Sequence, residues 1–189
     1  YYAENTGSVN LTQIAKALSL SKATCTRAIN DLSASGLISQ TAEGTNKWIT
    51  TAYTKSELLE KAYGRLKTPV DRILYVKGTA QIEHPIASGI RALARQSMIG
   101  VNDQDGAIAI SKKEAAKIPA EDICTKQYFE DFGGAVIEVW SYDPIILERD
   151  GCVDDISLLL SMDNDPNERV QTCLDEIRQK HGLPIKEEE

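Results

Sequence analysis

The sequence predicts an α+β fold in two domains, because helix-type and strand-type hydrophobic patterns alternate along the chain and the charge changes sign partway. Of the 189 residues, 42% are hydrophobic and 26% are charged, which suits one substantial core or two small ones. Residues 1–67 hold eight Lys and Arg against five Asp and Glu, a net charge of +3. Residues 68–189 hold thirteen against twenty-three, a net charge of −10. A mildly basic module therefore precedes a strongly acidic one, with the boundary at Thr68-Pro69.

Two short helices are expected near the start of the chain. Apolar residues recur at helical spacing over residues 9–18, where Asn10 or Thr12 is placed to cap the first helix. The segment Ser19-Leu20-Ser21 interrupts this pattern, and a second helix is expected over residues 21–35, with Ser21 as its N-cap and Gly36 as its stop. Four apolar side chains of this second helix are expected to face inward: Cys25, Ala28, Ile29 and Leu32.

A β-hairpin and a third helix are expected next. Polar residues lie between the apolar pair Leu37-Ile38 and the β-prone residues 48–51, which predicts a hairpin over residues 39–48 with Gly44 near its tip. A helix is expected over residues 55–66, and Pro69 ends it.

The pattern of residues 11–38 resembles the helix-turn-helix of MarR-type winged-helix regulators. Its members are Leu11, Thr12, Ile14, Ala15, Leu18, Leu20, Ser21, Thr24, Arg27, Ile29, Leu32, Gly36, Leu37 and Ile38. The small Ala15 allows two helices to cross closely, while Leu18 and Leu20 fix the turn between them. The resemblance implies an N-terminal winged helix-turn-helix domain, residues 1–67, that binds double-stranded DNA.

The face of the second helix that packing leaves free is expected to enter the major groove. With the hairpin as the wing, the predicted DNA-binding residues are Ser21, Lys22, Ala23, Thr24, Thr26, Arg27, Asn30, Asn46 and Lys47. In the family that the sequence resembles, the wing contacts the minor groove or the backbone, and Asn46 and Lys47 are the candidates for this contact. A second interpretation of Arg27 is a surface ion pair with Asp31, worth about 0.3 to 0.5 kcal/mol.

Residues 68–185 are predicted to form an acidic domain of mixed α/β structure. Strands are expected at residues 72–76, 107–110 and 135–142, and helices at residues 85–98, 112–117 and 165–180, the last with Asp165-Pro166 at its start. Residues 157–160 fit either a strand or a helix. The last four residues, 186–189, are expected to form a disordered tail.

Two stretches of the acidic domain, residues 85–93 and 153–160, resemble the C-terminal domain of abortive-infection antitoxin regulators of the AbiEi type. Residues 55–78 also resemble the linker helix that follows the wing in some bacterial regulators. The resemblance implies autorepression of an operon, with the acidic domain contacting a protein partner or sensing a ligand.

The sequence gives no indication of an enzyme, a cofactor or a metal site. It contains no P-loop, GxSxG, HExxH or Gly-rich dinucleotide motif, and its four cysteines form no CxxC pair. Adjacent carboxylates on a strand point to opposite faces, so Asp154-Asp155 is interpreted as a solvated cap and not as a cation site. Trp140 and Tyr142 are expected to share a face of a strand and to pack in the core, with a ligand pocket or a protein interface as the alternative.

Taken together, these patterns predict a cytoplasmic transcriptional regulator, a repressor that binds DNA as a homodimer. No run reaches the roughly 18 to 20 apolar residues that cross a bilayer, and no secretory signal is recognisable. One alternative is a winged-helix protein-interaction module, for example an antitoxin-like protein, which the modest charge of +3 favours. Another is a repressor that responds to a small-molecule effector. Because the chain starts at Tyr1, we also expect some N-terminal sequence to precede it.

Overall fold

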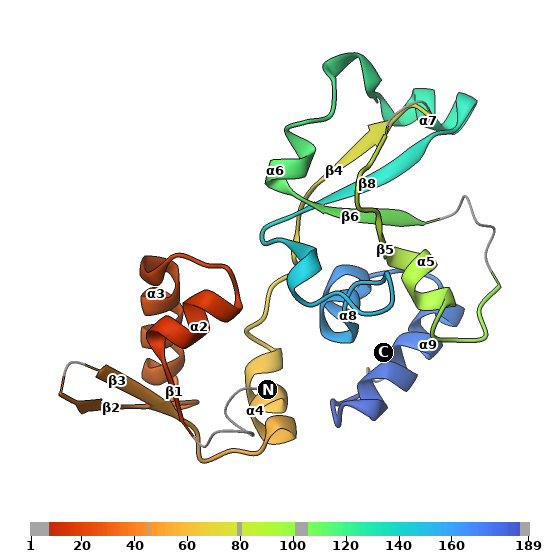
Figure 1. Ribbon diagram of the computed structural model, residues 1–189. Coiled ribbons are helices and arrows are strands. Elements are labelled where there is room, and N and C mark those ends of the chain that lie inside the picture. The colour runs from red at the N-terminus through yellow and green to blue at the C-terminus, as the bar shows by residue number, and fades with distance from the viewer. Residues whose placement is uncertain (1–7, 45, 79–80, 101–105, 186–189) are drawn as a thin grey trace. The chain divides into compact units, whose positions relative to one another are not determined.

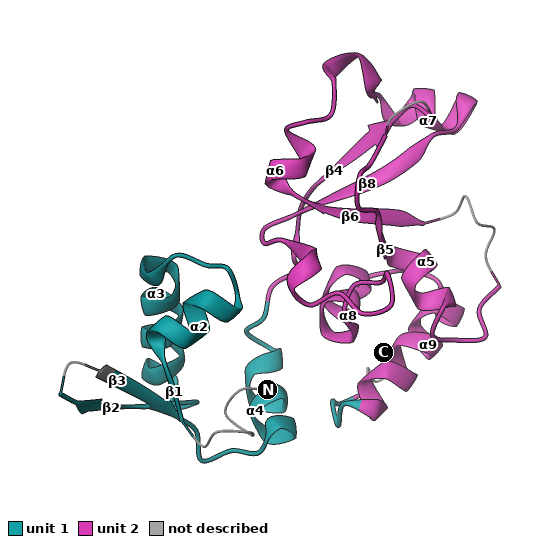
Figure 2. Ribbon diagram, in the orientation of Figure 1, with its two compact units in different colours: residues 1–66, 181–184 teal, residues 67–180, 185–189 magenta. Residues whose placement is uncertain are grey.

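The computed structural model describes residues 8–44, 46–78, 81–100 and 106–185 (Figure 1). The chain divides into two compact units, residues 1–66 with 181–184 and residues 67–180 with 185–189 (Figure 2). Each unit combines helices with a sheet, so the predicted α+β class is confirmed. The predicted tail at residues 186–189 lies outside the described residues. No helix within the described ranges combines the length and the apolar character that crossing a membrane requires.

The first unit packs helices against a small antiparallel sheet of strand order β1-β3-β2. Its elements are β1 (Val9–Asn10), α2 (Leu11–Ala17), α3 (Lys22–Ala34), β2 (Ser39–Glu43), β3 (Asn46–Thr50) and α4 (Lys55–Tyr63). Strands β2 and β3 pair from Ser39 opposite Thr50 to Glu43 opposite Asn46, which forms the predicted hairpin. Helix α4 ends at Tyr63 and not at the predicted residue 66, because the chain already turns at Gly64.

Main-chain hydrogen bonds fix the turn between α2 and α3. Ser19 adopts the left-handed conformation, with φ of +51°, and its amide donates to the Lys16 carbonyl at 3.3 Å. The Leu20 amide donates to the Ala15 carbonyl at 3.0 Å, which completes a Schellman motif at the end of α2. Ser21 then caps α3, as predicted. The orientation of α3 is therefore set by the four residues, 18–21, that join it to α2.

A compact apolar cluster holds α3 in place. Its buried members are Val9, Ala15, Cys25, Ile29 and Ile49. The prediction that Ala28 and Leu32 also face inward is wrong, because both are exposed. Cys25 and Ile29, four residues apart, are the only buried residues of α3. The buried stripe is thus narrower than the sequence pattern indicated.

The second unit contains a five-stranded mixed sheet in the order β5-β6-β8-β4-β7. Its strands are β4 (Val70–Val76), β5 (Ile86–Ser88), β6 (Ala107–Ser111), β7 (Ile123–Cys124) and β8 (Ala135–Trp140). Its helices are α5 (Gly89–Ala94), α6 (Lys112–Ala115), α7 (Lys126–Phe132), α8 (Asp155–Met162) and α9 (Glu168–Lys180), with short 3-10 turns at Ala120–Asp122 and Pro144–Ile146. Strands β6 and β8 are parallel and the other pairs are antiparallel.

Side chains alternate along β8 between the two faces of this sheet. Ile137 and Val139 join the apolar cluster that contains Ala115 of α6. Glu138 and Trp140 point to the opposite face and are also buried. Trp140 packs in the core as predicted, but β8 ends there, so Tyr142 reaches the Trp140 ring edge-on from outside the strand, with 5.4 Å between the ring centroids.

Three predictions for the second unit are corrected. Residues 86–88 form a strand and not the start of a helix, because they pair with β6 before the chain turns at Gly89, whose φ is +56°. Residues 157–160 belong to helix α8, which Asp154 caps, so Asp154 is a cap as predicted but does not lie on a strand. Helix α9 begins at Glu168, three residues later than predicted, because the Asn167 side chain accepts the Arg169 amide at its start.

Candidate nucleic-acid interface

Helix α3 presents one polar face to solvent. Its exposed residues include all six predicted DNA-binding positions within the helix, Lys22, Ala23, Thr24, Thr26, Arg27 and Asn30, whereas Cys25 and Ile29 are buried. The structure therefore places these six side chains where a duplex can reach them.

Hydroxyl groups on this face are already engaged in the structure of the helix. Ser21 Oγ accepts the Thr24 amide at 3.1 Å and lies 2.9 Å from Thr24 Oγ1. The Thr26 hydroxyl donates to the Lys22 carbonyl at 2.8 Å, one turn back. Ser21 and Thr24 therefore shape the start of α3, whereas the longer side chains of Lys22, Arg27 and Asn30 extend from it.

A groove of about 330 Å³ lies between α3 and the hairpin. It brings together four predicted site residues, Lys22, Thr26, Asn30 and Lys47. It also includes three polar residues that the sequence analysis missed: Asn10, Thr12 and Gln40. Ala23 and Arg27 do not line it. One side of the groove is thus formed by an edge of the exposed face of α3, and the other side by the hairpin.

Gln40 is the missed residue with the clearest role. Its side-chain amide donates to Asn30 Oδ1 at 3.4 Å, which connects β2 to α3 across the groove. The alternation of strand residues gives a signal for it, since Ile38 packs against the core and Gln40 is two residues further along the same face. Sequence reasoning that had assigned faces to the hairpin would have found it.

Three cations lie on this surface. Lys22, Arg27 and Lys47 are exposed, and within the described ranges none of the three forms an ion pair. The alternative pairing of Arg27 with Asp31 is therefore absent among the described side chains. Unpaired cations on an exposed surface are what phosphate contacts require.

The wing carries the last two predicted residues. Lys47 lies on β3 opposite Ala42 of β2, is exposed and lines the groove. Asn46 pairs with Glu43 through the backbone at the start of β3, and its side chain lies outside the described residues. Glu43, near the tip of the hairpin, is exposed, and its negative charge would repel DNA phosphates. The basic character of the wing therefore depends on Lys47.

Comparison with known proteins supports a winged helix-turn-helix in the first part of the chain. Residues 2–39 match a family model described as winged helix-turn-helix DNA-binding. No curated protein and no solved structure matches the chain. The matched stretch includes α2, α3 and the turn between them, and it ends at the first residue of β2. The predicted winged helix-turn-helix is thereby confirmed, and α2 and α3 are its two matched helices.

Proposed function

We propose that this protein is a transcriptional regulator that inserts α3 into the major groove of DNA and represses the genes it binds, in the manner of MarR-type regulators. One observation carries the proposal: the exposed face of α3 opens onto a groove whose opposite side is the wing, with Lys22, Asn30 and Lys47 along it. In helix-turn-helix proteins the residues near the start of the second helix reach base edges. Lys22 is the first residue of α3, and Arg27 lies in its second turn.

Each side chain of the interface suits a different part of the duplex. Arg27 is a match for guanine O6 and N7, and Asn30 for adenine N6 and N7, because both can form two hydrogen bonds to one base. Lys22 and Lys47 are point charges that suit phosphates, which position the protein without selecting a sequence. Specificity would then depend on Arg27 and Asn30, and salt-sensitive affinity on all three cations.

A homodimer fits this mode of binding. One recognition helix covers only a few base pairs, and paired helices bind half-sites about one helical turn, roughly 34 Å, apart. We therefore propose a two-fold symmetric operator. Sedimentation of the protein with and without its selected DNA tests this point, and a single protomer per duplex would contradict it.

The proposed function is tested by selecting bound duplexes from a random-sequence pool. The affinity of the protein for the enriched sequence is then compared with its affinity for a scrambled one. Enrichment of a two-fold symmetric site that wild type binds and Arg27→Ala does not is the expected result. A reporter gene placed behind the selected site then distinguishes repression, which we expect, from activation. Recovery of no enriched sequence would contradict specific DNA binding.

A second candidate function is a protein-interaction module, with the partner bound by the acidic part of the chain. It is favoured by the charge of −10 over residues 68–189 and by the weak resemblance of this part to AbiEi-type antitoxin regulators. The exposed ring of Phe132 lies on α7 with its centroid 4.8 Å from that of Tyr128, the two rings tilted by 41°, and it adds an apolar contact surface. Co-purification with the product of the neighbouring gene, together with the absence of salt-sensitive DNA binding, would support this candidate over the first.

A further inference from the structure

The second unit contains a hollow of about 560 Å³ that the DNA-binding proposal does not use. It lies beside α5 and the strands β6 and β8, and the connection between α8 and α9 forms its rim. Small residues, Gly89, Gly106 and Ala107, make the space on the sheet side. Its acidic lining residues are Glu138, Asp163 and Asp165, and no Lys, Arg or His is among the described residues that line it.

Glu138 is the unusual member of this lining. It is an acidic residue on the central strand β8, and yet only 9% of its surface is exposed. One oxygen, Oε2, accepts from the Ser88 hydroxyl at 2.6 Å and from the Trp140 ring nitrogen at 3.0 Å. The other oxygen, Oε1, receives no hydrogen bond from the described residues and lies on the side of Gly89, where a β-carbon would come within 3.8 Å of it.

The carboxylate of Glu138 is held by two neutral donors and forms no ion pair with any described cation. A buried charge without a counter-ion is costly, and proteins usually pair such a group. The two donors orient the carboxylate so that Oε2 is occupied and Oε1 faces the hollow. The geometry therefore leaves one carboxylate oxygen open for a donor from a ligand.

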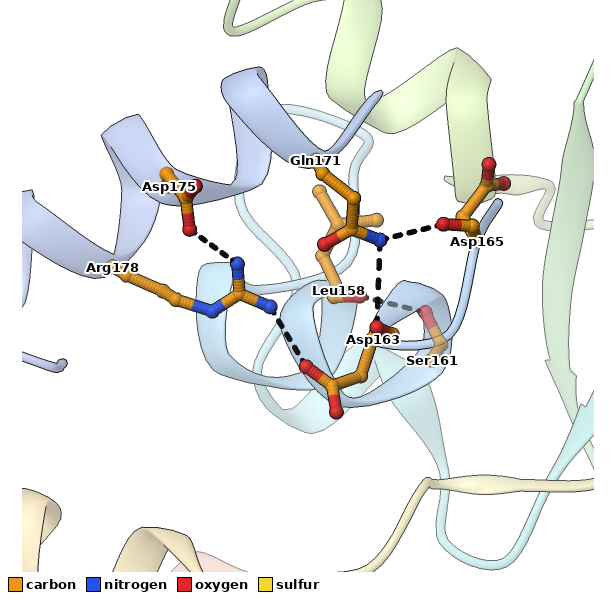
Figure 3. A network of polar contacts seen from close by, with 7 residues as sticks. All are labelled: Leu158, Ser161, Asp163, Asp165, Gln171, Asp175 and Arg178. Carbon is orange, nitrogen blue, oxygen red and sulfur yellow. Dashed lines mark hydrogen bonds and ion pairs between the residues drawn. The ribbon is translucent and has the colours of Figure 1, made fainter. Parts of the chain in front are cut away.

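The rim of the hollow is fixed in place by a separate network (Figure 3). Arg178 of α9, 1% exposed, pairs with Asp163 at 2.7 Å and with Asp175 at 2.6 Å. The Gln171 amide donates to the carbonyls of Asp163 at 3.4 Å and Asp165 at 2.8 Å. Arg178 therefore neutralises Asp163 from behind the rim, and it does not serve Glu138.

We propose that this hollow binds a small organic primary amine, with its ammonium group against Glu138 Oε1. An ammonium suits this position better than a guanidinium, because a guanidinium forms its strong paired contact with two carboxylate oxygens and only one is open here. Asp165 on the rim adds a second negative charge, so a diamine fits better than a monoamine. The ligand is thus an effector candidate for the second unit, independent of how the first unit meets DNA.

Isothermal titration of the full chain without DNA tests the proposal, with putrescine as the cationic probe and 1,4-butanediol as its neutral counterpart of equal chain length. Wild type is expected to bind putrescine at least about ten-fold more tightly than the diol. Glu138→Gln keeps an acceptor for Ser88 and Trp140 but loses the charge, and it is expected to weaken putrescine binding about ten-fold or more. The matched control, Glu176→Gln on the exposed surface of α9, is expected to bind as wild type does.

Asp165→Asn provides a second variant if Glu138→Gln does not fold, because its side chain still accepts the Asn167 amide and only a rim charge is removed. It is expected to weaken putrescine binding less than Glu138→Gln does. Equal binding of putrescine and the diol by wild type, or no binding of putrescine at about 10 mM, would overturn the proposal. Because no DNA is present, neither result bears on the proposed regulator function.

Discussion

The side-chain amide of Gln40 on β2 reaches the side-chain oxygen of Asn30 on α3, with 3.4 Å between the two atoms. Both residues are exposed, so this long hydrogen bond adds less than about 1 kcal/mol to stability. Its importance is geometric, because it holds two amides side by side across the groove that Lys22 and Lys47 line. An amide in this position can exchange its protein partner for an adenine edge without leaving a buried group unsatisfied.

Asn30→Ala is therefore expected to reduce discrimination between the selected DNA site and a scrambled duplex by about 1 to 3 kcal/mol, with unchanged unfolding by urea. Gln40→Ala is expected to have a smaller effect in the same direction, since it positions Asn30. Fluorescence anisotropy on both duplexes measures the ratio. Asn164→Ala, an exposed Asn of the second unit, is the control. A change in affinity that is equal for both duplexes would show that Asn30 does not read sequence.

Ser19 carries backbone strain that glycine would remove. Its φ of +51° lies in the left-handed region, where a residue with a β-carbon costs about 1 kcal/mol relative to glycine. Ser19→Gly is expected to stabilise the protein by about 0.5 to 1 kcal/mol, measured by urea unfolding. Gly36, at φ of +73° after α3, is the reciprocal control, and Gly36→Ser is expected to destabilise it by a similar amount. Destabilisation by Ser19→Gly would contradict the assigned turn.

Local signals in the sequence predicted the helix ends of α3 in the first unit, but not how many of its side chains are buried. Ser21 caps α3 and Gly36 ends it, as predicted, because capping depends on residues within one turn of the helix end. The exposure of Lys22, Arg27 and Asn30 follows from the same periodicity. Gln40 was missed because its role depends on which face of the hairpin meets α3, a tertiary relationship that helical spacing alone does not give.

The second unit was harder to predict because its short strands depend on their partners. Residues 86–93 have helical spacing of apolar side chains, yet Ile86–Ser88 is extended because β6 pairs with it. Strand β7 has two residues, which carry no periodicity of their own and pair with Tyr75 and Val76 of β4. The hollow at Glu138 was not visible either, since it joins residues from segments far apart in the chain. Pairing with a neighbouring strand therefore decided the structure of both β5 and β7.

Tyr142 is expected to titrate late. Burial of its phenol raises the pKa to about 12, against a lowering by the hydrogen bond with the Ser157 hydroxyl and a further raising by the charge of Asp154. A folded-state pKa above the ordinary value of 10.0 means that this group leaves stability unchanged below about pH 10, and that stability falls as the pH rises from 10 toward 12. Absorbance titration of tyrosinate should therefore show a late step that Tyr142→Phe removes. Retention of that step in Tyr142→Phe would contradict the assignment.

Arg178 is expected to be the most sensitive charged residue of the second unit. It is 1% exposed and joins two carboxylates that are themselves partly hydrated, at 35% and 23% exposure. Arg178→Met would leave Asp163 and Asp175 close together without the guanidinium, which we expect to cost about 2 to 3 kcal/mol, less than a fully buried pair would. Lys180→Met removes a more exposed partner of Asp155 and should change urea unfolding by less than about 1 kcal/mol. Equal effects of the two substitutions would contradict this ranking.

The most direct test of the central claim is fluorescence anisotropy on duplex DNA from the region upstream of the protein's own gene, at two salt concentrations. Wild type is expected to bind with an affinity that falls steeply with salt, by a slope of about 0.9 per phosphate contacted, and Lys22→Ala should reduce that slope by about 1. Arg27→Ala should abolish preference for the site, while Lys113→Ala, an exposed lysine of the second unit, should bind as wild type does. Absence of binding to this DNA and to random-sequence pools, or equal binding by all four proteins, would contradict the claim that α3 is a DNA-reading helix.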